Sequence, residues 1–361
     1  MSSDTIHAIK TSSCCRESRL RPDEPNSQPF FFFDPSLNPP RWRPASPPKH
    51  TAPLPPAGIP ADKIHLLSWN IDFSTPMPEE RMTAALKYLG EQQAEHEKTD
   101  GSPTVIFFQE MVASDLHLIN ETPWVREKFY MTDLSGNYWR SYYGTTTLVD
   151  RRLSLQRVFR VPYKLSAMQR DALFVDVKVQ DSVVRLCNTH LESLASGITR
   201  RPVQLKLAST FMLGTNNSSS ENTGRGEDTV SLSTPHAAIL AGDLNAFAPE
   251  DAAAPGQCNL TDAYLALGGK EGTEEGFEEG FTWGYQSQSE FPPRRMDKVL
   301  FCGGIEPLAY RLMGKGLKIR VEVRISDDED NNPADDPFED LWVTDHFGLV
   351  ADFRIKPRES N

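Results

Sequence analysis

Short apolar runs separated by turn-rich stretches fill the chain from Asp62 onward. The runs are rich in β-branched and aromatic residues and too short for typical helices, which favours buried strands. They occupy residues 64–69, 105–108, 173–177, 183–187, 237–241, 299–301 and 347–350. We expect a strand at each of these positions.

Apolar residues recur at helical spacing in two other segments. One lies around residues 79–97, behind Pro78 at a first-turn position, and the other lies around residues 199–213. The residues that share a face are Met82, Ala85, Leu86 and Leu89 in the first segment and Val203, Leu207 and Phe211 in the second. Strands mixed with helices in this way indicate an α/β or α+β fold.

The first 60 residues differ from the rest, because they hold nearly half of the prolines and few periodic apolar positions. We expect a disordered, proline-rich tail over residues 1–60 and one folded domain over residues 61–357. Within the tail, residues 30–33 are four consecutive phenylalanines. They are either a docking motif for a protein partner or a segment that lies on the folded domain or in solvent, and the second interpretation is favoured.

Three polar stretches interrupt the apolar pattern at residues 215–234, 268–280 and 326–340. The first is rich in Ser, Asn and Gly, the second in Gly and Glu, and the third in Asp and Glu. Stretches of this composition are usually solvated loops, which is what we expect at all three.

Charge and cysteine content narrow the functional class. A net charge of -12 argues against broad binding to nucleic-acid backbones, so any contact with nucleic acid should be local. The five cysteines have no zinc-type spacing and suit reduced thiols better than a secreted disulfide framework. No signal peptide or membrane span is visible. We expect a soluble protein of the nucleus or cytoplasm, neither secreted nor membrane-bound.

Polar clusters adjoin six of the predicted strands. They are residues 69–72 (WNID), 109–110 (QE), 188–192 (NTHLE), 242–245 (GDLN), 295–297 (RMD) and 344–346 (TDH). Four clusters follow a strand and two precede one. In an antiparallel or mixed sheet the start of one strand lies beside the end of its neighbour, so all six clusters can meet at one edge.

Each cluster taken alone has an ordinary structural explanation. Asn70 and Asn245 could form turns, Glu110 could face water at a strand end, and His190 or His346 could be a hydrogen-bonded structural histidine. The set of acids, amides and histidines at strand edges instead predicts a catalytic site. Hydrolysis of an anionic phosphodiester needs a divalent cation, an oriented water and hydrogen-bond donors. A hard carboxylate ligand such as Glu110 suits Mg²⁺, and the chain has no Cys/His cluster for zinc.

The same motifs resemble the endonuclease/exonuclease/phosphatase superfamily. WNID (69–72), FQE (108–110), THLES (189–193), GDLN (242–245), MDKVLF (296–301) and TDHFGL (344–349) follow the order of that family, over residues 62 to about 355. The resemblance implies a four-layered α/β sandwich of two mixed, largely antiparallel sheets flanked by helices. The folded domain over residues 61–357 would then be the catalytic domain, and we expect a monomer.

Within the superfamily, the motifs are most similar to the tyrosyl-DNA phosphodiesterase 2 group. The similarity rests on the WNID and THLES forms of two motifs, on Arg201 with Gln204, and on Trp283 before the MDKVLF strand. It implies a Mg²⁺-dependent phosphodiesterase that removes tyrosyl or peptide adducts left on DNA 5′ ends by topoisomerase II, a step of DNA repair. Nuclear localisation follows from that function alone.

The resemblance also implies a role for individual residues. Glu110 would bind Mg²⁺, or Mn²⁺ in its place, and Asp72 and Asp345 would belong to the same metal site. The catalytic group would comprise Asn70, Asp243, Asn245, His190, His346 and Asp297. Asp243 and Asn245 would position the attacking water, the two histidines would donate to phosphate oxygens, and Asp297 would orient His346. Tyr143, Arg170 and Trp283 would line the substrate groove, although a structural role for them is about as well supported.

Two other functions remain open at this stage. The first is a general nuclease or phosphatase of the superfamily that acts on other nucleic-acid ends, RNA, sugars or lipids. The second is a catalytically silent scaffold that binds partners through the proline-rich tail. The scaffold is disfavoured because none of the expected catalytic residue types has been replaced.

Overall fold

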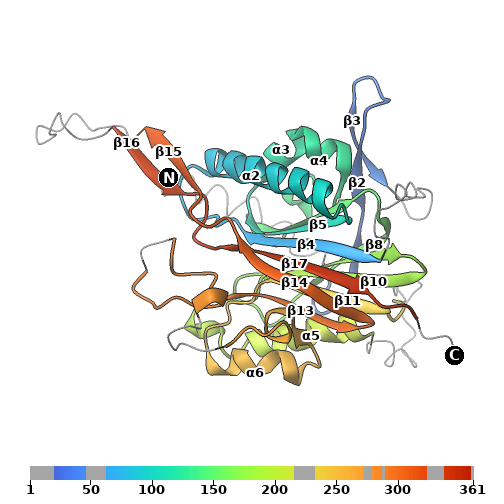
Figure 1. Ribbon diagram of the computed structural model, residues 1–361, viewed down its shortest axis with the longest axis vertical. Helices are drawn as coiled ribbons and strands as arrows, with labels where there is room; N and C mark the ends of the chain where they lie inside the picture. Colours follow the sequence, from blue (N-terminus) through green and yellow to red (C-terminus); the bar gives the residue numbers. More distant parts are fainter. Residues whose placement is uncertain are drawn as a thin grey trace, which may run out of the picture.

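Two β-sheets packed face to face form the centre of the molecule. The computed structural model describes residues 20–45, 62–214, 232–271, 278–286, 289–322 and 337–358. In these residues, the seven-stranded sheet has the order β1-β8-β9-β10-β11-β13-β12 and the eight-stranded sheet has the order β14-β17-β4-β5-β7-β6-β2-β3. Only β10/β11 and β4/β5 pair in parallel among the described strands. The predicted four-layered sandwich of two mixed, largely antiparallel sheets is confirmed (Figure 1).

The strands have the following bounds. The seven-stranded sheet contains β1 (Asn26–Gln28), β8 (Ser154–Pro162), β9 (Asp171–Val179), β10 (Ser182–Thr189), β11 (Ala237–Asp243), β13 (Asp297–Gly303) and β12 (Thr261–Asp262). The eight-stranded sheet contains β14 (Ile305–Met313), β17 (Gly348–Ile355), β4 (Lys63–Asn70), β5 (Thr104–Met111), β7 (Gly144–Asp150), β6 (Phe129–Met131), β2 (Phe30–Asp34) and β3 (Arg41–Ala45). All seven strands predicted from apolar runs are present.

Helices cover the outer face of each sheet. α2 (Pro78–Thr99), α3 (Ala113–Glu121) and α4 (Pro123–Lys128) pack on the eight-stranded sheet, and α5 (Arg201–Leu213) and α6 (Pro249–Gln257) pack on the seven-stranded sheet. Figure 1 shows these two helical layers above and below the sheets. The short helices are α7 (Ala263–Ala266), η1 (Gly136–Tyr138), η2 (Ala195–Gly197) and η4 (Glu278–Gly280). None of the helices in the described ranges is long and apolar enough to cross a membrane.

The apolar face predicted for α5 needs a correction. Val203 is 51% exposed, whereas Leu205, Ala208 and Phe211 are buried against the sheet. The four-residue spacings that link Val203, Leu207 and Phe211 are compatible with one face, but the helix is rotated so that Leu205 lies inward. The helix ends at Gly214, whose φ of 70° is the left-handed conformation that terminates many helices.

The N-terminal segment also needs a correction, because residues 26–45 are part of both sheets. β1 pairs with β8 at the edge of one sheet, and β2 pairs with β6 at the edge of the other. Pro29 alone separates β1 from β2, so the segment straps the two sheets together at this side. Phe30 is 3% exposed in the core between the sheets. The predicted disordered tail is therefore wrong for residues 26–45, while residues 1–19 and 46–61 lie outside the described ranges.

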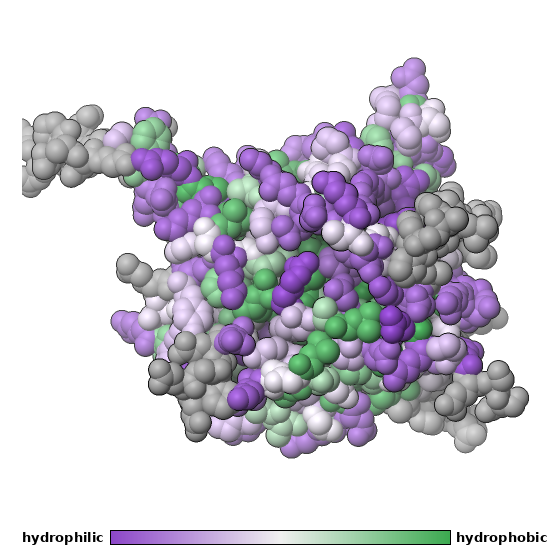
Figure 2. Space-filling view, viewed as in Figure 1, coloured by the Kyte–Doolittle hydropathy of each residue, from purple (hydrophilic) through white to green (hydrophobic). Residues whose placement is uncertain are grey.

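A two-stranded ribbon projects from the body near α2 (Figure 1). It consists of β15 (Lys318–Glu322) and β16 (Phe338–Trp342). The end of the acidic stretch predicted as a loop is therefore a strand, with Phe338, Glu339 and Asp340 exposed. Residues 215–231, 272–277 and 326–336 of the three predicted loops lie outside the described ranges. Figure 2 shows a mostly hydrophilic face with apolar side chains gathered in a band over β14 and β17.

Candidate active site

The six polar clusters meet at one edge of the sandwich, as predicted. β4 and β5 run parallel in one sheet and β10 and β11 run parallel in the other, so their carboxyl ends share an edge. β17 and β13 run antiparallel to β4 and β11, which places their first residues at that edge as well. Asp243, the last residue of β11, lies directly opposite Asp297, the first residue of β13.

Strand alternation explains why these side chains point toward one another. In β4 the residues Ile64 and Leu66 face the core between the sheets, while Leu67 and Trp69 face the helices. Asn70 is therefore in the inward register, two residues beyond Ser68. Val184 and Leu186 place Asn188 and His190 inward in the same way, and Ile239 and Ala241 place Asp243 inward. The site is the polar end of the layer that is otherwise filled by the core.

Glu110 is held by an irregularity at the end of β5. The pairing of β5 with β7 shifts between Phe108 and Met111, and Glu110 has a φ of 59°. A positive φ is strained for a residue with a side chain and is often found where a functional group must be re-aimed. The backbone N–H of Phe73 donates to Glu110 Oε2 at 3.1 Å. Burial raises the pKa of Glu110 to about 7, although the charge of Arg170 opposes this shift.

Asp72 holds the loop that follows β4. Its Oδ1 accepts from the N–H and the hydroxyl of Ser74, at 2.9 and 2.6 Å, and its Oδ2 accepts from the Thr75 hydroxyl. Its own N–H donates to Asn70 Oδ1 at 2.9 Å. The carboxylate of Asp72 is thus engaged within its own loop, whose backbone turns through a φ of 57°.

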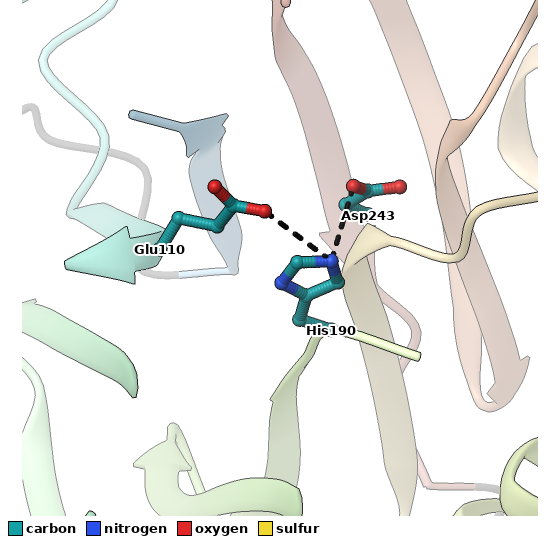
Figure 3. Close-up of side chains that lie close together, drawn as sticks. All are labelled: Glu110, His190 and Asp243. Atoms are coloured by element: carbon teal, nitrogen blue, oxygen red, sulfur yellow. Dashed lines mark ion pairs between the residues drawn. The ribbon is translucent and has the colours of Figure 1, made fainter. Parts of the chain in front are cut away.

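His190 is a neutral hydrogen-bond donor. Arg170 Nη1 lies 2.8 Å from His190 Nδ1, and a guanidinium can only donate, so Nδ1 accepts and Nε2 carries the proton. Burial, and then the charge of Arg170, lower the pKa of His190 to about 4, which keeps the ring neutral. Nε2 lies 3.3 Å from Asp243 Oδ2 and 3.7 Å from Glu110 Oε1 (Figure 3). Among the residues that the structure describes, this buried nitrogen has no hydrogen-bond partner with good geometry.

Asp243 is at the centre of the group. Asn70 Nδ2 donates to its Oδ2 at 3.0 Å, and the N–H of Asn245 donates to its Oδ1 at 2.8 Å. Burial alone would raise the pKa of Asp243, but His190 and His346 outweigh burial and keep the pKa below its usual range. The preceding Gly242 has a φ of 145°, and a Cβ there would lie 1.9 Å from the carbonyl oxygen of Thr189. Only glycine allows the two parallel strand ends to approach this closely.

His346 is the cationic member of the site. Its Nδ1 lies 2.7 Å from Asp297 Oδ2, and its Nε2 lies 3.7 Å from Asp345 Oδ1 and 3.8 Å from Asp243 Oδ2. Burial alone would lower the pKa of His346, but the charges of Asp297, Asp345 and Asp243 raise it well above the usual value. A protonated imidazole therefore directs its Nε2–H toward the carboxylate cluster.

A recess with a volume of about 390 Å³ opens beside these groups. Trp283 lines it, and the indole N–H of Trp283 donates to Asp345 Oδ2 at 2.7 Å. Leu194 and Phe291, which are 64% and 72% exposed, lie at the same recess. Its lining is more apolar than polar away from the carboxylates, which suits a substrate that carries flat apolar groups.

Tyr143 and Arg170 line a second, smaller recess that also includes Glu110, and Phe73 stacks on Tyr143. The ring of Phe73 lies parallel to that of Tyr143 with centroids 4.2 Å apart, and the Arg170 guanidinium lies 5.2 Å from the Tyr143 centroid. Arg170 also donates to Ser193 Oγ at 2.9 Å, and its buried Nε has no partner in the described residues. Cationic and aromatic surfaces of this kind bind aromatic groups and phosphates.

The site fits a divalent cation. In the part of the chain that the structure describes, two groups of side chains offer ligand atoms within 4.8 Å of one another, namely Glu110, His190 and Asp243, and Asp243, Asp297 and His346. Both histidines carry protons on the nitrogen that faces the site, so the carboxylates are the available ligands. Glu110 is buried beside other acids and has a pKa of about 7, so its charged form is unfavourable without a counter-charge. A bound cation would stabilise that charged form. Oxygen ligands of this type suit Mg²⁺ or Mn²⁺ in preference to softer metals.

The structure brings all twelve predicted site residues to this edge. Two of the residues predicted for the metal site, Asp72 and Asp345, lie beside the candidate ligand groups and not within them. Among the described residues, Glu110 belongs to one of the two ligand groups, whereas Asp72 and Asp345 belong to neither. Asp72 is engaged by Ser74 and Thr75, and Asp345 accepts the indole N–H of Trp283. Both therefore lie beside the two ligand groups, and their place in the metal site stays a prediction.

Other residues near the site were not predicted. The chief ones are Phe73, whose N–H holds Glu110, and Arg81, which is 1% exposed on α2. A signal existed for Arg81, because it lies four and eight residues before Ala85 and Leu89 on the buried face of the helix. Arg201 and Gln204, noted in the sequence, brace the THLES segment from behind: Arg201 donates to Glu192 O and Gln204 accepts from Glu192 N.

Comparison with known proteins agrees with this geometry. The sequence model of the Endonuclease/Exonuclease/phosphatase family matches residues 67–346, and no curated protein sequence matches the chain. Among solved structures, a humanized form of D. rerio TDP2 is 17% identical with a TM-score of 0.55, covering 81% of this chain and 99% of that one. TDP2 from C. elegans is 19% identical with a TM-score of 0.56, covering 81% and 75%.

A Bacteroides thetaiotaomicron mannosyl-6-phosphatase is also similar, at 14% identity and a TM-score of 0.51, covering 80% of this chain and 99% of that one. At these identities the solved structures show the shared fold. The sequence match covers more than half of the chain and includes all six polar clusters in full. The chain therefore belongs to the endonuclease/exonuclease/phosphatase family of phosphoester hydrolases.

Proposed function

We propose that the protein is a Mg²⁺-dependent phosphodiesterase that hydrolyses 5′-phosphotyrosyl linkages on DNA, as part of the repair of topoisomerase II adducts. The observation that carries the proposal is the Arg170–Tyr143–Phe73 stack beside Glu110, together with the largely apolar recess that Glu110 and Trp283 line. A tyrosyl-DNA substrate has an aromatic group on one side of the phosphate and nucleobases on the other. One similar solved structure is that of D. rerio TDP2 complexed with single strand DNA product.

Acidic and amide groups prepare the site for the anionic substrate. Glu110 would hold the cation, which when bound would supply a Lewis acid that neutralises charge on the phosphate. Asp72 and Asp345 would support it from the surrounding loops. Asp243 accepts a hydrogen bond from the attacking water and orients it, and Asn70 and Asn245 fix the direction of its carboxylate through their bonds at 3.0 and 2.8 Å.

The two histidines stabilise the charge that develops on the phosphate. His346 donates as an imidazolium, with Asp297 fixing its Nδ1–H at 2.7 Å. His190 donates as a neutral imidazole whose tautomer is fixed by Arg170. His346 can therefore neutralise negative charge on the phosphate. His190 adds a hydrogen bond to the phosphate without placing a second positive charge beside the cation.

Two walls select the substrate. Tyr143 and Arg170 contact the tyrosyl side of the phosphate, and Trp283 contacts the nucleotide side. Local contacts of this kind do not require a basic protein, which is consistent with a net charge of -12.

A second candidate is a phosphatase or nuclease for other phosphoesters. The observation that favours it is the similarity to the mannosyl-6-phosphatase, which shares the fold at a TM-score of 0.51. The exposed apolar residues Leu194 and Phe291 at the larger recess favour a nucleotide over a sugar.

The deciding experiment uses a synthetic oligonucleotide with a 5′-phosphotyrosyl group. With Mg²⁺ the protein should convert it to a 5′-phosphate end, and chelation of the metal should stop turnover. The same preparation is tested on an abasic-site duplex, an RNA oligonucleotide and mannose 6-phosphate. No turnover of the tyrosyl substrate, with turnover of another member of this panel, would refute the proposal and identify the alternative.

Substitutions connect the activity to the site. Glu110→Gln and His346→Ala should each lower turnover by about 10²-fold to 10³-fold, the usual effect of losing one group that stabilises the transition state. Glu306→Gln is the matched control, because Glu306 pairs with Arg354 at the opposite end of β14 and β17. Equal activity of the Glu110→Gln and Glu306→Gln variants would contradict the assignment of Glu110.

A further inference from the structure

Arg81 is a buried arginine in the first turn of α2. It is 1% exposed and lies on the same helical face as the core residues Ala85 and Leu89. Buried arginines usually pair with a carboxylate. Arg160, Arg185 and Arg201 in this chain all do so, but Arg81 has no carboxylate within ion-pair distance in the part of the chain that the structure describes.

The guanidinium of Arg81 is instead surrounded by backbone carbonyl groups. Nε donates to Pro76 O at 2.9 Å. Nη1 donates to Ile71 O at 2.8 Å and to Val343 O at 2.7 Å, and Nη2 donates to Asp72 O at 2.6 Å and to Thr75 O at 2.9 Å. A guanidinium has five N–H groups, and five separate carbonyls use them all. Arg81 therefore has no free donor for a ligand.

The five carbonyls belong to two loops that carry site residues. Four of them lie in residues 71–76, the loop that holds Asp72 and places the N–H of Phe73 on Glu110. The fifth is Val343, which lies two and three residues before Asp345 and His346. A second tie joins the same loops, because the Thr344 hydroxyl donates to the carbonyl of Asn70 at 2.7 Å.

We propose that Arg81 is a positioning residue, which fixes the loop of Asp72 and the loop of His346 in one arrangement and so sets the geometry of cation and phosphate binding. The proposal rests on the proposed function only in requiring that a phosphoester is hydrolysed at this site. Because the 71–76 loop folds around the guanidinium, Arg81 acts through the residues it holds.

The chemistry of arginine explains why this position needs it. A lysine keeps the charge but has three donors on one nitrogen and cannot reach five carbonyls that surround a planar group. A methionine fills a similar volume without charge or donors. Loss of these bonds frees carbonyls in two loops, and a shift of about 1 Å in catalytic groups can cost about 10²-fold in rate.

The test compares the full-length Arg81→Lys and Arg81→Met variants with the Arg185→Lys variant. Arg185 is a matched control, since it is fully buried and bonds to Asp176 and to the carbonyls of Phe211 and Ser233, away from the site. For each variant we measure Mn²⁺ binding by electron paramagnetic resonance, kcat and KM, and Tm. Substrates are the 5′-phosphotyrosyl oligonucleotide and bis(p-nitrophenyl) phosphate.

A positioning role and a purely electrostatic role of Arg81 predict opposite changes in the affinity for Mn²⁺. Removal of a positive charge in Arg81→Met should tighten Mn²⁺ binding if only the charge matters. Positioning predicts about tenfold weaker Mn²⁺ binding in both Arg81 variants, and a fall in kcat of about 10-fold to 10²-fold with KM nearly unchanged. The Arg185→Lys variant should lose thermal stability without either effect.

Three results would overturn the proposal: tighter or unchanged Mn²⁺ binding in Arg81→Met, wild-type binding and kcat in Arg81→Lys, or the same losses in Arg185→Lys. If Arg81→Met does not fold, Arg81→Lys decides alone, because a charge-only role predicts no change there. Failure of the wild type to cleave the tyrosyl substrate would refute the proposed function, and Mn²⁺ binding would still decide the role of Arg81.

Discussion

The substitution Phe30→Ala tests whether residues 26–45, the N-terminal strap that joins the two sheets, are part of the folded domain. Phe30 lies in the core between the sheets, 3% exposed, with its ring edge-on to that of Tyr130 at 5.4 Å. Truncation of a buried phenylalanine costs about 3–5 kcal/mol, and we take about 3 kcal/mol because β2 is near the edge of its sheet. An unfolding entropy of about 2 cal/mol/K per residue over 361 residues then gives a fall in Tm of about 4 °C.

The matched control is Phe31→Ala, one residue along the same run of phenylalanines. Phe31 is half-buried and belongs to none of the core clusters of the described residues. It should cost about 1 kcal/mol or less and lower Tm by about 1 °C. Thermal unfolding followed by circular dichroism measures both. Equal Tm values for the two variants, or no change in Phe30→Ala, would refute the strap and restore the prediction of a disordered tail.

Three further predictions concern the site. Asp297→Asn removes the largest of the charges that raise the pKa of His346, so the imidazolium should lose its proton at lower pH. The alkaline limb of the pH–rate profile should therefore move to lower pH. An alkaline limb that does not move would contradict this role of Asp297. Because burial raises the pKa of Glu110 to about 7, a cation must displace a proton from Glu110 below that pH. Calorimetry should find that Mn²⁺ affinity falls about tenfold per pH unit below pH 7 and is constant above it. A Mn²⁺ affinity that is constant from pH 5 to 8 would contradict this prediction. Arg170→Leu removes a charge that lowers the pKa of His190, so NMR titration should place that pKa above the value of about 4, and a pKa that stays there would show that burial alone sets it.

The strands were predictable because their apolar runs are buried on both faces. β4, β5 and β11 face the core on one side and a helix on the other, so each contains adjacent apolar residues that stand out in the sequence. β8 was not predicted, because polar residues interrupt its apolar run. Arg160 interrupts its apolar pattern, and only the structure shows that this side chain is buried with Asp133 and Asp171.

The position of the site was predictable, but the state of its groups was not. Motif order and strand ends were enough to bring Glu110, His190, Asp243 and His346 together. Whether each histidine is charged depends on its partner, which is Arg170 for one and Asp297 for the other. Residues that lie far apart in the sequence make these contacts, so local pattern cannot reveal them. The strap was missed because prolines suggested disorder, although Phe30 finds its place only after both sheets exist.

The polar end of the inter-sheet layer links fold stability to catalysis. Polar side chains in the inward register would be costly in the middle of the sandwich, but at its end several of them bond to a partner on the opposite sheet. Asn70 of one sheet donates to Asp243 of the other at 3.0 Å, and Gln109 donates to Asn188 at 2.8 Å. The separation of the sheets therefore sets the separation of the catalytic groups. That separation is fixed by core residues, so a substitution in the core can change turnover without touching the site.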